Sequence, residues 1–144
     1  MCGRYELHSN PAAIALAFGL AHTPSVRPRY NVAPMQEVPI VRVSASGARE
    51  FVAVRWGLVP RWAKDPAIGS KMINARGETV ASKPSFRTAF RRHRCLIPAN
   101  GFYEWMPAAD GRKQPVLIAM KDGSVFAFAG LYERWLTGDG EPLD

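Results

Sequence analysis

The sequence begins Met1-Cys2-Gly3-Arg4-Tyr5, and residues 2–7 predict a short strand with a cysteine at its head. If Met1 is removed, Cys2 carries both a free α-amine and a thiol, with reference pKa values of about 7.7–8.0 and 8.5. Such a 1,2-aminothiol condenses with an aldehyde, first as a Schiff base and then as a thiazolidine ring. The alternative is that Cys2 is an ordinary residue of an early strand, since free cysteine is often buried.

The residues that follow predict two helices and several strands. Asn10 is a good N-cap, Pro11 suits a first helical position and Gly19 suits a stop, so a helix is expected over 11–18. A second helix is expected over 82–93 and a loop over 23–34, while 72–79 is expected to be a short strand or turn. Strands are expected over residues 37–43, 49–59, 95–98, 101–106, 114–120 and 125–135. The 114–120 run is almost continuously apolar, which predicts a central strand buried on both faces.

Length and composition fit one domain over residues 1–144. We expect an α+β fold in a single domain, with a mostly antiparallel sheet that is strongly curved or barrel-like and a few flanking helices. Nineteen basic and twelve acidic residues give a formal net charge of +7, which favours a polyanionic partner such as nucleic acid. The sequence shows no apolar run of about 20 residues and no secretory signal, so we expect no membrane partner. Two cysteines are too few for a disulfide framework, and a cytoplasmic, nucleoid-associated protein is expected.

Two further segments carry candidate chemistry. Asn74 and Arg76 are spaced i, i+2 and would point to one side of a strand, where the amide orients a carbonyl or amine and the guanidinium clamps a phosphate. The alternative is a surface turn. Glu104, within Gly-Phe-Tyr-Glu-Trp at 101–105, is flanked by aromatic residues that would desolvate it and suit it to acid–base work. The alternative is an exposed strand carboxylate.

Aromatic and basic residues are interleaved as in proteins that hold single-stranded nucleic acid by base stacking in a positive groove. Trp62 lies in a polar loop and suits such a role better than Trp56, which lies in an apolar strand. The three histidines lack ligand spacing, so neither a metal site nor a cofactor is expected.

Taken together, these segments resemble the SOS response-associated peptidase family, which shields abasic sites in single-stranded DNA. The resemblance covers Cys2 to about Trp135 and rests on five blocks in the family's order, residues 1–5, 29–34, 55–60, 73–79 and 101–105. It implies that Met1 is removed and that Cys2 forms a thiazolidine crosslink with the ring-opened aldehyde of an abasic site. The family's peptidase name reflects the proposed removal of residues ahead of the cysteine.

The resemblance also implies a role for each matched residue. Cys2 would be the nucleophile, Asn74 would position the terminal amine or the abasic sugar, and Glu104 would exchange protons in a lyase-type reaction. The contacts to DNA around the lesion, including a single-strand/double-strand junction, would come from Arg4, Asn31, Arg76 and the loop residue Trp62.

One family feature is missing from these 144 residues, namely a histidine in a later Ile-His-x-Arg-Met-Pro motif. His8, His22 and His93 lie in other contexts, so we expect the N-terminal part of a longer protein, with slower proton transfer. Two alternatives stay open: a non-catalytic remnant that binds single-stranded or junction DNA, and a cysteine peptidase acting on other proteins. The second needs a base beside the thiol, and no histidine motif here supplies one.

Overall fold

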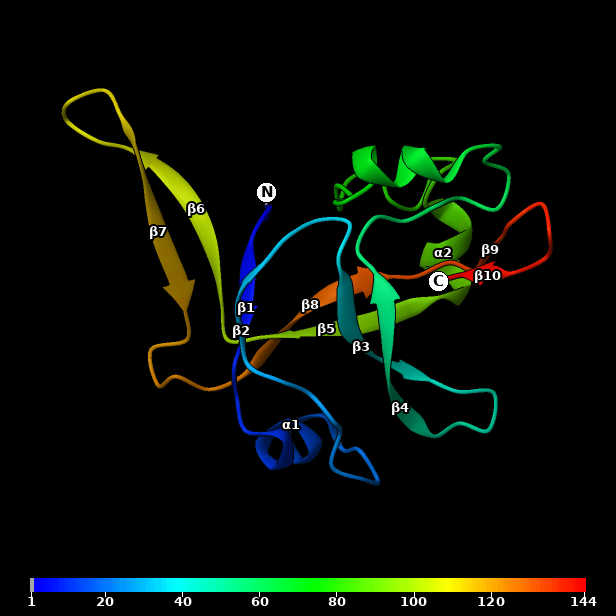
Figure 1. Cartoon of the computed structure of the whole chain (residues 1–144), viewed down its shortest axis with the longest axis horizontal. Coiled ribbons are helices and arrows are strands. Elements are labelled where there is room, and N and C mark those ends of the chain that lie inside the picture. Colours follow the sequence, from blue (N-terminus) through cyan, green and yellow to red (C-terminus); the bar gives the residue numbers. More distant parts are fainter. Residues whose placement is uncertain (1) are drawn as a thin grey trace.

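The computed structural model describes residues 2–144 and shows an α+β fold in which every strand pairing is antiparallel. Figure 1 shows the elements in chain order. They are β1 (Tyr5–Leu7), α1 (Pro11–Phe18), β2 (Arg29–Val32), β3 (Glu37–Val43), β4 (Arg49–Arg55), the 3₁₀ helix η1 (Pro66–Lys71), α2 (Arg87–Arg92), β5 (Arg94–Ala99), β6 (Gly101–Pro107), β7 (Lys113–Ala119), β8 (Phe126–Leu131), β9 (Trp135–Leu136) and β10 (Pro142–Leu143).

The expected α+β class with mostly antiparallel strands is confirmed, but the strands form two open four-stranded sheets and one small ribbon and do not close into a barrel. The first sheet has the order β2-β1-β6-β7, and the second has the order β4-β3-β5-β8. The aromatic ring of Tyr5 on β1 packs edge-on against Trp56 and against Phe128 of β8, at centroid distances of 5.5 and 6.2 Å. These contacts join the two sheets in one core.

Helix α1 has the predicted ends. The side chain of Asn10 accepts a 2.8 Å hydrogen bond from the backbone N–H of Ala12, and Gly19 closes the helix in the left-handed conformation. Ile14 and Phe18 are the buried residues of the helix and pack into the core.

The second helix is shorter than predicted, because α2 covers only residues 87–92. Pro84 disfavours helical geometry at Lys83, and residues 84–86 form a turn in which the Lys83 carbonyl accepts from Phe86 and Arg87. The loop prediction over 23–34 was also wrong in part, since β2 occupies 29–32. Strand β4 stops at Arg55 because Gly57 has φ +141°, a conformation outside the strand region.

The prediction of a central strand over 114–120 was wrong. Strand β7 is the last strand of its sheet and pairs with β6 in a hairpin that projects from the body of the molecule (Figure 1). An apolar run shows that a strand tolerates burial, but the pairing partner fixes its place in the sheet. The exposed large apolar side chains of this hairpin are 44–56% exposed and comprise Trp105, Met106, Leu117, Ile118 and Met120.

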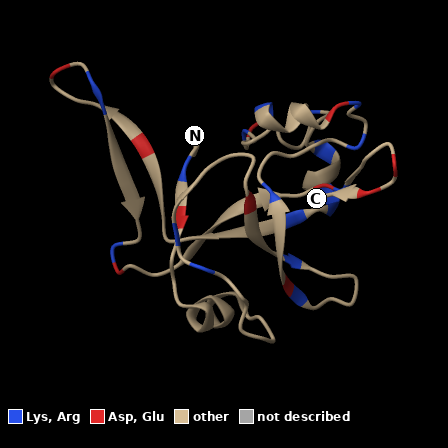
Figure 2. Ribbon diagram, viewed as in Figure 1, with Lys and Arg blue, Asp and Glu red and all other residues tan. Residues whose placement is uncertain are grey.

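Across residues 2–144, no helix is long and apolar enough to span a membrane. Basic residues gather on and around α2, where Arg87, Arg91, Arg92 and Arg94 follow one another closely in sequence (Figure 2).

Candidate active site around Cys2

The head of the described chain lies beside the middle of the first sheet. Strand β1 sits between β2 and β6, and the backbone N–H of Tyr103 donates a 2.9 Å hydrogen bond to the carbonyl of Arg4. Cys2, three residues before β1, is therefore half-buried against the core, with its Sγ 3.5 Å from that same Arg4 carbonyl oxygen. Met1 lies outside the described residues, so its removal remains a prediction.

Asn74 contacts Cys2 directly. Its Nδ2 donates a 2.7 Å hydrogen bond to the Cys2 carbonyl oxygen, across 72 residues of sequence. The segment that carries Asn74 is irregular coil followed by turns, so the prediction that Asn74 and Arg76 share one side of a strand was wrong. The indole N–H of Trp56 instead fixes this coil by donating a 2.8 Å hydrogen bond to the carbonyl of Ile73.

Residues 56–72, which include η1, form a segment whose two ends are hydrogen-bonded to one another. The N–H of Leu58 donates to the carbonyl of Met72 at 3.2 Å. Gly57 and Gly69, both buried, face one another so closely that a Cβ on Gly57 would lie 2.7 Å from the Gly69 oxygen, and one on Gly69 would lie 2.6 Å from the Gly57 oxygen. Only glycines fit this contact, which holds the two ends of the loop together.

Glu104 is half-buried on β6 and acts on Cys2 electrostatically. Burial raises the pKa of the Cys2 thiol above its ordinary value, and the negative charge of Glu104 raises it further. The thiol form therefore predominates at neutral pH, and nucleophilic attack requires a proton acceptor. The carboxylate of Glu104 can accept a proton and lies close enough to Cys2 to act on it electrostatically.

Arg4 and Asn31, two of the predicted DNA contacts, lie together. An Arg4 guanidinium nitrogen donates to Asn31 Oδ1 at 2.8 Å. Asn31 lies on β2 at an irregularity in the pairing with β1, since Tyr5 pairs with Val32 and Leu7 with Arg29.

The other two predicted DNA contacts lie on exposed loops. Arg76 opens a turn in which its carbonyl accepts from Thr79 and Val80, and its side chain is exposed. Trp62 is also exposed, while its neighbour Ala63 is buried and its carbonyl accepts a 2.8 Å hydrogen bond from the indole of Trp135. The hydrogen bonds described for residues 2–144 join Asn74 to Cys2 and Arg4 to Asn31, and do not link either pair to Arg76 or Trp62.

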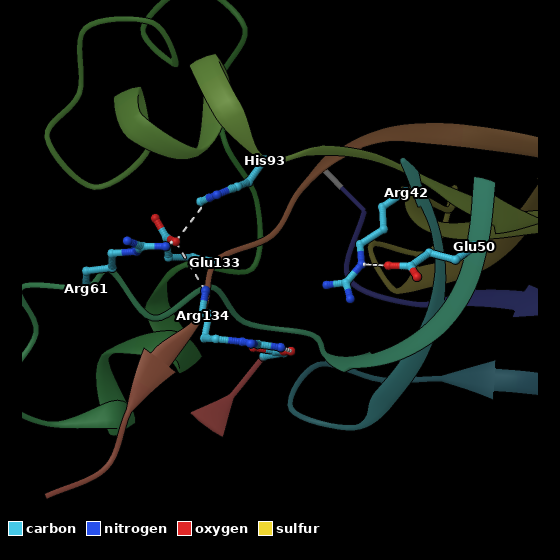
Figure 3. Close-up of polar contacts among 7 residues, drawn as sticks. Arg42, Glu50, Arg61, His93, Glu133 and Arg134 are labelled. Carbon is cyan, nitrogen blue, oxygen red and sulfur yellow. Dashed lines mark hydrogen bonds and ion pairs between the residues drawn. The ribbon is translucent and has the colours of Figure 1, made fainter. Parts of the chain in front are cut away.

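A polar cluster that the sequence reasoning missed lies between η1, α2 and β8. Glu133 is buried, and its Oε1 accepts 2.9 Å from Arg61 Nε and 3.2 Å from the Arg134 N–H, with His93 Nδ1 at 3.1 Å (Figure 3). Arg134 in turn donates two hydrogen bonds, 2.9 and 3.0 Å, to the carboxylate of Asp144. The sequence offers only the close spacing of Glu133 and Arg134 as a signal, because Arg61 and His93 arrive from other segments.

Both cysteines carry free thiols, and burial raises the pKa of Cys95 to about 12. Within the described part of the chain, no three His, Cys, Asp or Glu side chains gather in an arrangement that holds a metal ion.

Cys2, Asn74 and Glu104 thus lie in one region of the fold, and similarity to known proteins gives the class of this chain. The chain belongs to the SOS response associated peptidase (SRAP) family, whose sequence model matches residues 1–144. Among its relatives is the abasic site processing protein YoqW of Bacillus subtilis strain 168, which is 46% identical over 146 residues covering 99% of this chain and 65% of that protein. The abasic site processing protein HMCES of Gallus gallus is 37% identical over 103 residues, covering 64% of this chain and 30% of that protein.

Solved structures share the fold. A crystal structure of a protein from Bacteroides thetaiotaomicron superposes with a TM-score of 0.83 at 28% identity, covering 99% of this chain and 65% of that one. A protein from Bordetella bronchiseptica also superposes with a TM-score of 0.83, at 27% identity, with 99% and 68% covered. The chain thus spans about 65% of the length of YoqW and of the Bacteroides protein.

Proposed function

We propose that this chain processes abasic sites in DNA, by binding single-stranded DNA and forming a thiazolidine crosslink between Cys2 and the ring-opened aldehyde of the lesion. The single observation that carries the proposal is the placement of Cys2 at the head of the chain, with its carbonyl held by Asn74 and its thiol in the field of Glu104. Family membership and relatives named abasic site processing proteins support the same chemistry.

The proposed reaction requires that Met1 be removed, which the family's self-processing would accomplish by hydrolysing the bond before Cys2. The freed α-amine attacks the aldehyde carbon, and loss of one water gives a Schiff base. The Cys2 sulfur then adds to the C=N carbon, while the thiol proton ends on the nitrogen. Glu104 is proposed to relay protons in both steps, first to the departing water and then between sulfur and nitrogen.

The proposed DNA contacts surround this centre. Arg4 and Asn31 would hold phosphate or sugar beside β1, and Arg76 and Trp62 would contact the strand from exposed loops, where the aromatic ring would stack at a junction. With a formal net charge of +7, binding is expected to weaken steeply as salt rises, because phosphate contacts release counterions. A protein acting on chromosomal DNA would reside in the cytoplasm at the nucleoid.

The test is a denaturing gel of the chain incubated with a single-stranded oligonucleotide that carries one abasic site. We expect a heat-stable shifted band with the parent protein, whose Met1 removal is checked by mass spectrometry. Cys2→Ala should lose the band, whereas Cys95→Ala, a matched change at the other free cysteine, should keep it. The absence of a band in protein that lacks Met1 would contradict the proposal, and DNA binding alone would then favour a non-catalytic binding module.

A further inference from the structure

A β-bulge changes the direction of two neighbouring side chains on β2. Because Tyr5 pairs with Val32 and Leu7 with Arg29, both Tyr30 and Asn31 stand opposite the single residue Glu6. A bulge of two residues against one bends its strand and redirects side chains, and such bulges are frequent next to active sites. Both bulged residues are exposed, whereas regular alternation would have turned one of them inward.

The two bulged residues contact different side chains of the segment around β1. Asn31 Oδ1 accepts the 2.8 Å hydrogen bond from Arg4 described above. The ring of Tyr30 stacks on the imidazole of His8, with centroids 5.0 Å apart and planes inclined by 17°. Tyr30 is nevertheless 61% exposed, so His8 backs the ring while much of its surface faces solvent.

A buried carboxylate holds this aromatic pair in place. Glu6 is only 6% exposed, and its Oε1 lies 3.2 Å from His8 Nε2. The hydroxyl of Tyr103 lies 3.1 Å from Glu6 Oε2 and 3.0 Å from the carbonyl oxygen of Tyr30. Glu6 therefore orients the supporting imidazole, and the single hydroxyl proton of Tyr103 is shared between Glu6 and the backbone carbonyl of the exposed tyrosine. A ring fixed in advance loses little conformational freedom when a ligand stacks on it.

We propose that Tyr30, backed by His8, is a stacking platform for a nucleobase of the single strand whose phosphate or sugar meets Arg4 and Asn31. The inference rests on the proposed function, because it takes the polyanionic partner to be single-stranded DNA. Proteins hold unpaired bases without reading their identity by stacking them on exposed aromatic rings within a positively charged surface. Tyr30 and Asn31 are consecutive in the chain. The same bulge would therefore place Asn31 against the sugar-phosphate backbone of the DNA and Tyr30 against a neighbouring base.

The test uses an undamaged single-stranded oligonucleotide containing the fluorescent base 2-aminopurine, so that it does not depend on crosslinking. Parent protein should bind and quench the fluorescence by stacking. Tyr30→Ala should bind roughly 5- to 150-fold more weakly, the range expected for one lost base–aromatic stack, and should lose the quenching. Tyr30→Phe, which keeps the ring, should match the parent. Leu16→Ala, a change of another exposed apolar residue on α1, is the matched control.

The outcomes separate the platform from the proposed function. If Tyr30→Ala equals the parent in affinity and quenching while the parent crosslinks abasic DNA, the platform is refuted and the proposed function stands. If the parent neither binds the undamaged strand nor crosslinks the damaged one, the proposed function fails and the platform with it. Thermal melting checks folding, and Tyr30→Leu, which keeps apolar bulk without a ring, should also lose quenching if Tyr30→Ala proves unstable.

Discussion

The side-chain amide of Asn74 and the main-chain carbonyl of Cys2 are joined by a 2.7 Å hydrogen bond that closes a span of 72 residues. The bond ties the head of the chain to a coil that is itself held by Trp56. It fixes the peptide group that follows Cys2 and thereby restricts the direction in which the thiol projects, and with it the Cys2 nitrogen that would become the free α-amine once Met1 is removed. Proximity and orientation of this kind are a large source of rate in covalent chemistry.

Asn74→Ala is therefore expected to slow crosslinking to abasic DNA. Loss of one neutral hydrogen bond, typically about 0.5–1.5 kcal/mol, corresponds to a rate roughly 2- to 12-fold lower if the bond acts fully in the transition state. A single-turnover time course on denaturing gels measures the effect. Asn10→Ala, which removes the cap of α1, should lower stability by about 1 kcal/mol and leave the crosslinking rate unchanged. Equal rates for Asn74→Ala and the parent would contradict the positioning role.

The two thiols are expected to differ in reactivity with pH. Burial and the Glu104 charge raise the pKa of Cys2, and burial raises that of Cys95 to about 12. Because the thiolate is the reactive form, iodoacetamide labelling of Cys2 should rise with pH along a curve displaced upward from that of free cysteine, and Cys95 should remain unlabelled in the folded protein. Peptide mass spectrometry distinguishes the sites. Faster labelling of Cys95 than of Cys2 at pH 8 would be inconsistent with this order.

Glu104→Gln should change thiol reactivity and crosslinking in opposite directions. Removing the negative charge lowers the pKa of Cys2, so the thiolate fraction at pH 8 increases and alkylation becomes faster. Crosslinking should become slower, by about 10²-fold or more, because the proposed proton relay through Glu104 is lost. Both rates are measured on the same protein. If both increase together, Glu104 acts only through its charge and is not an acid–base group.

Glu133→Gln should destabilise the fold. The buried carboxylate accepts hydrogen bonds from Arg61 and from the backbone of Arg134, and charged hydrogen bonds of this kind are typically worth about 1.5–3 kcal/mol (Figure 3). Urea unfolding followed by tryptophan fluorescence gives the change in free energy. Asp110→Asn, which breaks an exposed pair with Arg112, should leave the midpoint unchanged. Similar midpoints for Glu133→Gln and the parent would show that the cluster does not stabilise the fold.

The β6–β7 hairpin is expected to promote self-association through its exposed apolar side chains and the outer edge of β7. Leu117→Lys should reduce both the binding of the dye ANS and the concentration-dependent increase in mass seen by light scattering. Leu16→Lys, at a residue 86% exposed on α1, serves as the control for an added charge. If the parent protein stays monomeric at high concentration, the prediction that the β6–β7 hairpin promotes self-association is wrong.

Sequence patterns predicted the elements whose signals are local. The cap at Asn10 and the stop at Gly19 predicted α1, and the strand expected over 37–43 is β3, with both ends as predicted. The place of β7 could not be predicted in this way, because its apolar composition does not say which strands lie beside it. The predicted helix over 82–93 was too long, because Pro84 disfavours helical geometry at the preceding residue, Lys83, and α2 begins only at Arg87.

The candidate site was predictable as a set of residues but not as an arrangement. Cys2, Asn74 and Glu104 were found from residue type and family resemblance, and the structure brings Asn74 to the Cys2 carbonyl by a coil, not by the strand first expected. The outward turn of Tyr30 depends on a bulge, which is set by pairing with β1 and leaves no trace in the alternation of β2 itself.

The contact between Gly57 and Gly69 has a consequence for how the chain tolerates change. Both residues lie in the largely irregular segment 56–72 that precedes Asn74, where substitutions are ordinarily accepted, yet each faces the other's carbonyl oxygen with no room for a methyl group. In a saturation-mutagenesis experiment scored for crosslinking, these two positions should be as intolerant as the core residues Ile14 and Val32. Such intolerance at Gly57 and Gly69 would show that the placement of Asn74 against Cys2 depends on this close contact between two backbone segments.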